Sequence, residues 1–376
     1  MKILNKSESL QYLDQYAALA NSRHNAPNPY GTSDWLSHFI AEVVPADERL
    51  MVVESTPPGA AGPDGFMLLQ LDRSGRDARA LSNFYTSLCA PLHADATDRR
   101  AMVQRLVDGL AAVRPRLDTV NWSPLDAEAE DVNHLQACLQ ASGWYVRRYF
   151  CFGNRYEATT GKSFDDYMAG RDSKLRNTFE RKGKKLLASG RIDIATTPDQ
   201  VDAAMDAYER IYAKSWKQPE PYPNFSRGWA RRCAEQGWLR LGVAWLGDEP
   251  IAAQIWYVFE GRGYIYKLAY DETHAKLSAG TVLTGHLMRH VLEVDRVHEV
   301  DFLSGDDGYK RAWMADRRDR VGLLACNLRT PRGLLMAGKQ WLAERTAGWR
   351  KRSQDSWGRH AGPAKPTEDA AASTEA

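Results

Sequence analysis

The stretch from Gly261 to Lys310 constrains the fold most, because strand, loop and helix signals follow one another there without a break. Aromatic and branched residues at 264–270 predict a strand that begins after a glycine and ends before an aspartate. Apolar residues at 282–292 recur at helical spacing and predict a helix with one apolar stripe. A second strand and a loop rich in Gly, Asp and Lys follow. The stretch therefore predicts a strand–loop–helix–strand unit of an α/β fold.

The loop before the predicted helix ends in the small residues Ser278, Ala279 and Gly280. Small side chains leave the N–H groups of a helix N-terminus open, and this geometry binds phosphate or pyrophosphate. Close packing alone explains many such loops. The pattern by itself therefore leaves anion binding and simple packing as two open interpretations.

Length and composition indicate two globular domains. The 376 residues exceed what one core usually holds, and 43% hydrophobic and 26% charged residues are typical of a globular chain. A net charge of +2 does not indicate a nucleic-acid partner. The N-terminus lacks the apolar core of a signal peptide, and no segment is long and apolar enough to span a membrane. We therefore expect a cytoplasmic protein.

The order of the predicted elements divides the chain into four segments. Residues 1–160 begin with helical patterns and then alternate between strands and helices, including a strand-like run at 81–85. Residues 161–190 predict a basic connecting helix, and residues 191–350 predict a second α/β domain. Residues 351–376 have little to bury and predict a disordered tail.

The connecting segment is strongly basic. Between Arg171 and Arg191 it carries eight Lys or Arg residues against two acidic residues. A solvated helix surface explains such a run in most proteins. The alternative is a basic face that attracts a phosphorylated or acidic substrate. This face is centred on Lys174, Arg176, Arg181 and Lys182.

A family resemblance rests on two signatures, DFLSGDDGYKRAW and YDETHAKLSAGTVL, and on the order of the second-half elements. They resemble the GNAT acyltransferase fold and, within it, the CelD/BcsL-type acetyltransferase group. The first-half phrase LSNFYTSLCAPL resembles the same group, which is similar to the FemABX transferases with their two GNAT-like halves. The resemblance covers most of residues 45–345. It implies an α/β fold of tandem GNAT-like domains, each a mixed, largely antiparallel sheet flanked by helices.

The resemblance also implies acetyl-CoA, or another acyl-CoA, as the co-substrate. The residues implied for its pyrophosphate loop are Ser278, Ala279, Gly280 and Thr281. Leu268 and Ala269 lie on the strand whose backbone would bond the pantetheine arm. The usual loop reads Arg/Gln-x-x-Gly-x-Gly/Ala, whereas here only Lys276 and Gly280 match it. The acyl donor is therefore left open between acetyl-CoA and a different donor.

Acyl transfer to an amine needs a neutral amine, a donor to the carbonyl oxygen and a proton for the leaving thiolate. Asp301 is predicted to orient or deprotonate the amine, and Tyr309 to protonate the thiolate. Lys310 is predicted to stabilise the oxyanion, because its place in YKRAW resembles the FKxxF-like motif of FemABX proteins. A carboxylate at a strand end is also often a loop cap or an ion-pair partner, and a tyrosine is often simply packed.

The acceptor site is predicted at a second set of residues. Trp216 and Tyr222 flank or lie in the proline-rich loop at 219–223, which in the GNAT fold borders the acceptor. An aromatic lid and ordinary core packing are both consistent with them. Asp306 is also assigned to the acceptor, although Asp-Asp-Gly is a good turn sequence in its own right. Lys174 and Arg176 are assigned to the same substrate.

No metal site is predicted. His286 and His290 share a helix face, but the HExxH pattern is absent and no carboxylate recurs at ligand spacing. The sequence thus favours an N-acyltransferase that moves acetyl from acetyl-CoA to an amine, for example an amino sugar in polysaccharide or cell-envelope biosynthesis. One alternative is an aminoacyl-tRNA-dependent transferase, with the basic segment on RNA phosphates. The other is a non-catalytic subunit at a membrane polysaccharide synthase.

Overall fold

The computed structural model describes residues 1–22, 28–94, 97–215 and 217–358. The elements of the first half are β1 (Lys2–Leu4), α1 (Lys6–Gln15), α2 (Ala17–Ala20), η2 (Pro29–Gly31), α3 (Ser33–Val43), β2 (Leu50–Ser55), β3 (Gly65–Leu71), β4 (Asp77–Ala80), β5 (Leu92–His93), α4 (Arg99–Ala112), β6 (Thr119–Asp126), α5 (Glu130–Ala141) and β7 (Trp144–Ala158). Those of the second half are α6 (Phe164–Ala169), α7 (Ser173–Leu187), β8 (Gly190–Ala195), α8 (Pro198–Ala213), α9 (Phe225–Glu235), β9 (Leu239–Leu246), β10 (Glu249–Phe259), β11 (Arg262–Tyr270), η3 (Glu272–Leu277), α10 (Ala279–Glu293), β12 (Glu299–Ser304), α11 (Gly308–Trp313), β13 (Asp316–Asn327) and α12 (Pro331–Gly358).

One continuous mixed sheet joins the two halves. Its order is β1-β2-β3-β4-β6-β13-β7-β12-β11-β10-β9-β8, and β5 pairs with β3 beside this path. Neighbouring strands are antiparallel, except that β4 with β6 and β11 with β12 are parallel pairs. In each half a run of antiparallel strands therefore leads to one parallel pair. The two halves repeat the same plan.

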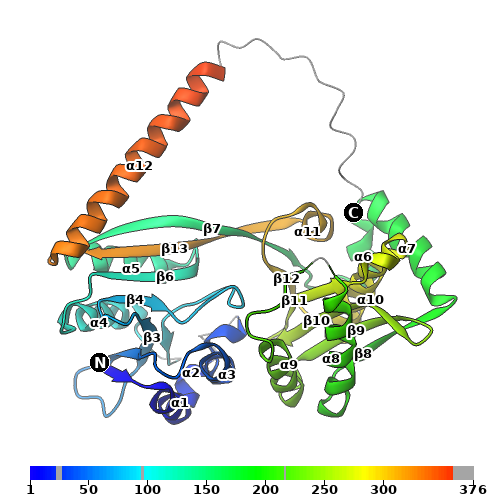
Figure 1. Ribbon diagram of the computed structural model, residues 1–376, viewed down its shortest axis with the longest axis horizontal. Coiled ribbons are helices and arrows are strands. Elements are labelled where there is room, and N and C mark those ends of the chain that lie inside the picture. Colours follow the sequence, from blue (N-terminus) through cyan, green and yellow to red (C-terminus); the bar gives the residue numbers. More distant parts are fainter. Residues whose placement is uncertain (23–27, 95–96, 216, 359–376) are drawn as a thin grey trace.

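The last strand of each half crosses into the other half. β7 follows α5 of the first half but pairs with β12, and β13 follows α11 of the second half but pairs with β6. β7 and β13 also pair with each other, from Trp144 opposite Asn327 to Tyr156 opposite Asp316. Figure 1 shows them as two long strands that run across the molecule. The segments predicted as separate domains thus each complete the sheet of the other.

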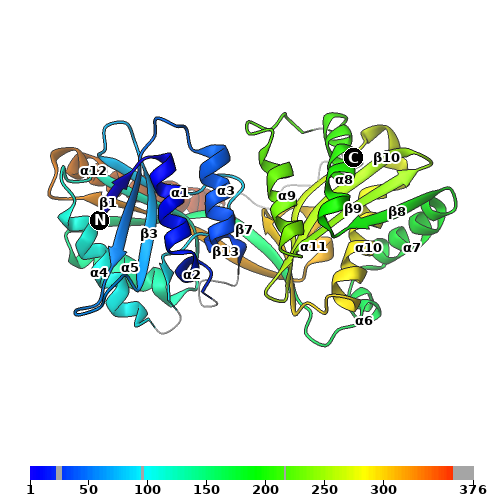
Figure 2. The same cartoon turned by 90° about the horizontal axis from the view of Figure 1, so that it is seen from below.

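Helices from both halves share one core. Figure 2 shows the halves side by side, with α1 and α3 on the first and α8 and α9 on the second. The ring of Trp35 in α3 lies 4.8 Å from that of Trp229 and 5.5 Å from that of Phe225, both in α9. All three side chains are fully buried. Removing this apolar surface from water stabilises the contact between the halves.

The apolar stripe of α10 packs against the sheet and against α7. Gly285 lies where α7 crosses, and a Cβ at that position would lie 2.2 Å from a ring carbon of Phe179. The absence of a side chain therefore allows the close approach. This contact places the basic helix α7 beside the first turns of α10.

The predicted elements are largely confirmed, with three differences. No strand forms at 81–85, because β4 ends at Ala80 and the chain continues as a loop. The predicted basic helix is two helices, α6 and α7. α12 continues to Gly358, and the rest of the predicted tail, 359–376, lies outside the described residues. Over the part of the chain that the structure describes, no helix is both long and apolar enough to cross a bilayer.

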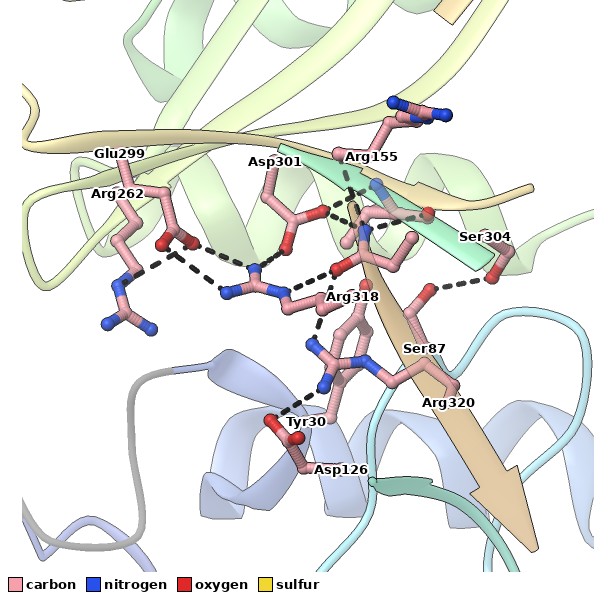
Figure 3. A network of polar contacts seen from close by, with 12 residues as sticks. Tyr30, Ser87, Asp126, Arg155, Arg262, Glu299, Asp301, Ser304, Arg318 and Arg320 are labelled. Atoms are coloured by element: carbon pink, nitrogen blue, oxygen red, sulfur yellow. Dashed lines mark hydrogen bonds and ion pairs between the residues drawn. The ribbon is translucent and has the colours of Figure 1, made fainter. Parts of the chain in front are cut away.

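A buried polar network fixes the crossing strands (Figure 3). Arg318 on β13 donates to Asp301 and, at 2.8 Å, to Glu299, both on β12. Its Nε donates to Oδ1 of Asn154 on β7 at 2.6 Å. Arg320 reaches the same Asn154 oxygen at 3.3 Å and donates to Asp126 of β6 at 2.7 Å. Four strands from both halves are thereby held at one point.

The Arg318→Met variant is expected to lower the free energy of unfolding by about 3 kcal/mol, because it leaves the Asp301 carboxylate buried without its cation. Arg317→Met is the matched control. The ion pairs of Arg317 with Asp306 and Asp319 are more exposed than the contacts of Arg318. Arg317→Met should therefore lower the free energy of unfolding by less than about 1 kcal/mol. Urea unfolding measures both values. Equal losses in the two variants would contradict the structural role of Arg318.

Candidate functional site

A cavity of about 870 Å³ opens where β11 and β12 separate. The two strands pair only from Arg262 opposite Glu299 to Tyr264 opposite Asp301. Beyond these residues β11 keeps its bonds to β10 as far as Tyr270, while β12 turns away. Because the N–H and C=O groups of a strand point alternately to its two edges, residues 265–269 of β11 present backbone groups to the cavity that pair with no strand in the described part of the chain.

The N-terminus of α10 faces the same cavity. Ser278 precedes the helix in the left-handed region, with φ 53° and ψ 38°, and no side chain among the described residues caps the first turn. Ala279, Gly280 and Thr281 all line the cavity. The first intrahelical bond runs from Val282 N–H to the Ser278 carbonyl, at 3.0 Å. The N–H groups of the first turn and the positive end of the helix dipole are thus available to an anion.

Lys310 and Tyr309 reach the cavity from α11. The Asp307 carboxylate caps this helix by accepting from the Lys310 N–H at 3.0 Å. The Lys310 ammonium donates to the carbonyls of Phe302, at 3.1 Å, and Ser304, so it is held at the end of β12. Burial lowers the pKa of Lys310, and the carboxylate of Asp307 opposes this shift. A cation is therefore fixed beside the opening between the strands.

Tyr309 lies against the first turn of α10. Its hydroxyl is 2.8 Å from Oγ1 of Thr284 and 3.4 Å from the Gly280 carbonyl oxygen. Burial raises its pKa to about 12, and hydrogen bonding to Thr284 acts in the opposite direction. At neutral pH the phenol is therefore protonated and can donate a proton.

Asp301 lines a different cavity from Lys310 and Tyr309, although its charge raises the pKa of Lys310 against the effect of burial. Its carboxylate accepts from Asn154 Nδ2 and from the Leu303 N–H, each at 2.6 Å, and from Arg318. It lies among the residues of a second cavity rather than the first. Because its oxygens are occupied by fixed donors, Asp301 positions β12, and we do not retain it as the base that deprotonates an amine.

The residues predicted to bind the acceptor are also spread apart. Asp306 accepts hydrogen bonds from Arg155, Arg311 and Arg317, and these arginines hold its pKa well below the usual range. It does not line the cavity between β11 and β12. Asp306 therefore organises the loop before α11 instead of facing that space.

Two other predicted groups lie away from the cavity. Lys174 is exposed on α7, and Arg176 donates to the Ala169 carbonyl at 3.1 Å. Tyr222 is half-buried with its ring 6.2 Å from that of Tyr85, so it packs at the edge of the shared core. Trp216 lies outside the described residues. Among the residues predicted for the donor, Leu268 lines the cavity, whereas the Ala269 side chain is buried in the core.

The residues of the cavity wall that the sequence interpretation missed include Tyr85, Lys217 and Lys267. Lys267 forms an ion pair with Glu220, which also accepts from the Tyr85 hydroxyl. Burial lowers the pKa of Lys217 to about 8, and the charge of Lys267 acts in the same direction. One signal was present in the sequence, because Lys267 is the charged residue within the otherwise apolar and aromatic run 264–270.

The second cavity, of about 210 Å³, lies at the junction of the halves. It shares Ser87 and Leu303 with the first cavity. The Ser87 hydroxyl is 3.1 Å from that of Ser304, which lines the first cavity only. The remaining wall is mixed, with polar side chains such as Tyr30 and Asn154 beside apolar ones such as Leu88 and Leu135. The two cavities therefore meet at this pair of serines.

No metal cluster is found within the described ranges, where no three His, Cys, Asp or Glu side chains converge.

Most of the first cavity's wall lies in a segment that is similar to a known protein family. Residues 173–311 match the family described as an acetyltransferase (GNAT) domain. The search of curated proteins gave no match. Among solved structures, FemX has a TM-score of 0.60 at 9% identity, over 90% of this chain and 100% of that chain. L-PGS from Bacillus licheniformis has a TM-score of 0.52 at 14% identity, over 91% and 96%.

These likenesses show the fold. The predicted fold class, GNAT-like α/β halves with a mixed sheet flanked by helices, is confirmed. The narrower resemblance to the CelD/BcsL-type group stays a prediction.

The lowered pKa of Lys217 predicts a pH-dependent stability. An unfolded lysine titrates near 10.5, so between pH 8 and 10.5 the unfolded chain binds more protons than the folded one. The free energy of unfolding should therefore rise with pH in this interval. Lys217→Met removes this contribution, so the variant should gain stability over the wild type at pH 7 and lose the gain by pH 10.5.

Urea unfolding at both pH values checks this difference. Lys339→Met, on the exposed part of α12, is the control and should show no such change with pH. If the difference in the free energy of unfolding between Lys217→Met and the wild type stays constant from pH 7 to pH 10.5, the lowered pKa of Lys217 is contradicted.

Proposed function

We propose that this protein transfers an acyl group from a CoA thioester to an amine, with acetyl-CoA as the favoured donor. One observation carries the proposal. The open N-terminus of α10, the unpaired edge of β11 and the Lys310–Tyr309 pair all face a single cavity. An anion site, a strand edge for amide groups, a cation and a proton donor are the parts that thioester chemistry needs.

The cavity fits a CoA-type donor in charge and shape. A Cβ built at Gly280 meets only the Tyr270 ring, at 3.7 Å, so the space before the helix is open. The first turn of α10 would hold the pyrophosphate through its N–H groups. The pantetheine amides would pair with the edge of β11. Lys182 of α7 donates to the Lys276 carbonyl at 2.5 Å, which brings further positive charge beside this turn.

The lysines of the cavity also favour a neutral acceptor. Lys217, Lys267 and Lys310 surround the space, so an ammonium ion would be repelled while an uncharged amine would not. Lys310 would stabilise the carbonyl oxygen as it becomes negative. Lys217, with a pKa of about 8, replaces Asp301 as the base that we propose.

The acceptor would approach through the second cavity. Its volume of about 210 Å³ and the polar groups of its mixed wall, among them Tyr30 and Asn154, suit a small amine such as an amino sugar, and it meets the donor cavity at Ser87. This route supports an acceptor from polysaccharide or cell-envelope biosynthesis. Along this route the donor lies on one side of the Ser87–Ser304 pair and the amine on the other.

Gly280→Glu tests the donor site. The new carboxylate would lie where the pyrophosphate binds, so the affinity for acetyl-CoA should fall at least about tenfold. Stability should be retained, because an acidic residue suits the first turn of a helix. Gly338→Glu makes the same change on α12, where nothing lies within 4 Å, and should leave affinity unaltered. Calorimetry measures both, and equal affinities in the two variants would move the donor site elsewhere.

Ser87→Phe tests the acceptor route. The ring would fill the junction, so the KM for an amine such as glucosamine should rise by about tenfold or more, with a smaller change in KM for acetyl-CoA. Ser87→Ala keeps the junction open and is the matched control. Release of the CoA thiol gives the rates. An unchanged KM for the amine in a folded Ser87→Phe variant would exclude this route.

A further inference from the structure

A chain of buried polar side chains runs beneath the donor cavity. Trp256 Nε1 donates to Gln254 Oε1 at 2.8 Å, and both residues lie on β10. Gln254 Nε2 donates to Oγ1 of Thr284 on α10 at 2.7 Å, and to the Gly280 carbonyl at 3.0 Å. The Thr284 hydroxyl is 2.8 Å from that of Tyr309, which lines the cavity. The chain thus ends at the proposed proton donor.

The first two bonds have a fixed direction. An indole N–H can only donate, so the Gln254 atom that faces Trp256 must be its carbonyl oxygen. The amide nitrogen of Gln254 is therefore the atom that faces Thr284, and it can only donate. Oγ1 of Thr284 accepts from Gln254 and keeps its own proton for another partner.

The proton of the Thr284 hydroxyl has two acceptors within reach. The Gly280 carbonyl lies 3.0 Å from Oγ1 of Thr284, and the Tyr309 oxygen lies 2.8 Å away. The Gly280 carbonyl already accepts from Gln254, and in an α-helix it is also the partner of the Thr284 N–H. Its two lone pairs are then in use. Of the two acceptors within reach of the Thr284 hydroxyl, Tyr309 is the nearer, so the geometry favours donation to Tyr309, and the Tyr309 hydroxyl keeps only a long contact of 3.4 Å to the Gly280 carbonyl.

We infer that Trp256, Gln254 and Thr284 orient the Tyr309 hydroxyl so that its proton points into the donor cavity, toward the sulfur of the leaving thiol. Gln254 and Thr284 are positioning residues, because they act only through Tyr309. The inference rests on the proposed function. It adds the residues that, by donating toward the Tyr309 oxygen, leave the Tyr309 proton for the sulfur.

The proton balance of the step is simple. The amine nitrogen forms a bond to the acyl carbon, and the bond between that carbon and sulfur breaks. The sulfur takes the proton of Tyr309 and leaves as a thiol. The nitrogen loses one proton to Lys217, the proposed base, and the phenolate regains a proton from solvent as Lys217 releases its own. The products are an amide and a free thiol.

Packing alone does not account for the chain. Gln254 is 1% exposed and Thr284 is fully buried, and burying such polar groups costs stability unless every partner is in place. Apolar residues of similar size would fill the same space beneath α10 without that cost. The polar chain leads from buried side chains of β10 to the Tyr309 hydroxyl in the cavity. This arrangement is the one expected if the chain orients that hydroxyl.

The test compares Thr284→Val, Thr284→Ser, Gln254→Leu and Tyr309→Phe with the wild type. In Thr284→Val we expect kcat to fall roughly tenfold, with the KM for acetyl-CoA within about twofold, since one hydrogen bond to the proton donor is lost. Thr284→Ser keeps the hydroxyl and should restore the rate. Tyr309→Phe should lose about a hundredfold in kcat, as for a missing general acid. Gln254→Leu should resemble Thr284→Val.

A second measurement does not depend on turnover. Calorimetry compares CoA with desulfo-CoA, which lacks the sulfur. The wild type should bind CoA severalfold more tightly, and Thr284→Val and Tyr309→Phe should lose this preference. If Thr284→Val and Gln254→Leu keep both the wild-type kcat and the preference, the inference is wrong. If the wild type binds neither compound, it is the proposed function that fails instead.

Discussion

The exchange of β7 and β13 between the halves is the constraint on which the site depends. β12 has β11 on one edge only as far as Tyr264, so its other edge must be held by β7. The buried contacts of Asp301 with Arg318 and Asn154 fix that edge, beside the positive φ of Leu303. Because β7 holds the other edge of β12, the end of β12 can diverge from β11 and still keep a fixed position in the sheet. The opening between the strands is therefore a stable feature of the sheet.

The candidate site combines features set by local sequence with features set by the long-range pairing of strands. The small residues before α10 leave a helix N-terminus open, and the diverging strands leave a strand edge open. Neither feature alone specifies a ligand. Together with Lys310 and Tyr309 they give one cavity a positive end, a row of backbone amides and a proton donor. This combination supports a thioester donor more directly than the family likeness does.

Periodicity predicted the elements that carry the site, because β9 to β11 and α10 have strong local patterns. Lys310 was predicted from the likeness of YKRAW to the FemABX motif and Tyr309 from its place beside it, and both line the cavity. The role of Asp301 could not be judged, since Arg318 and Asn154 reach it from other strands. The strand exchange was invisible for a related reason: alternation shows that β7 and β13 are strands but not which strand each one joins. Lys217 was missed because a cavity wall is assembled from distant segments.

A crystal structure of the full chain with CoA tests the central claim most directly. The account predicts pyrophosphate oxygens within hydrogen-bond distance of the N–H groups of Ala279, Gly280 and Thr281. It also predicts pantetheine amides along β11 and the sulfur facing the Tyr309 hydroxyl. CoA bound elsewhere on the molecule, or bound here with its pyrophosphate away from the first turn of α10, would contradict it.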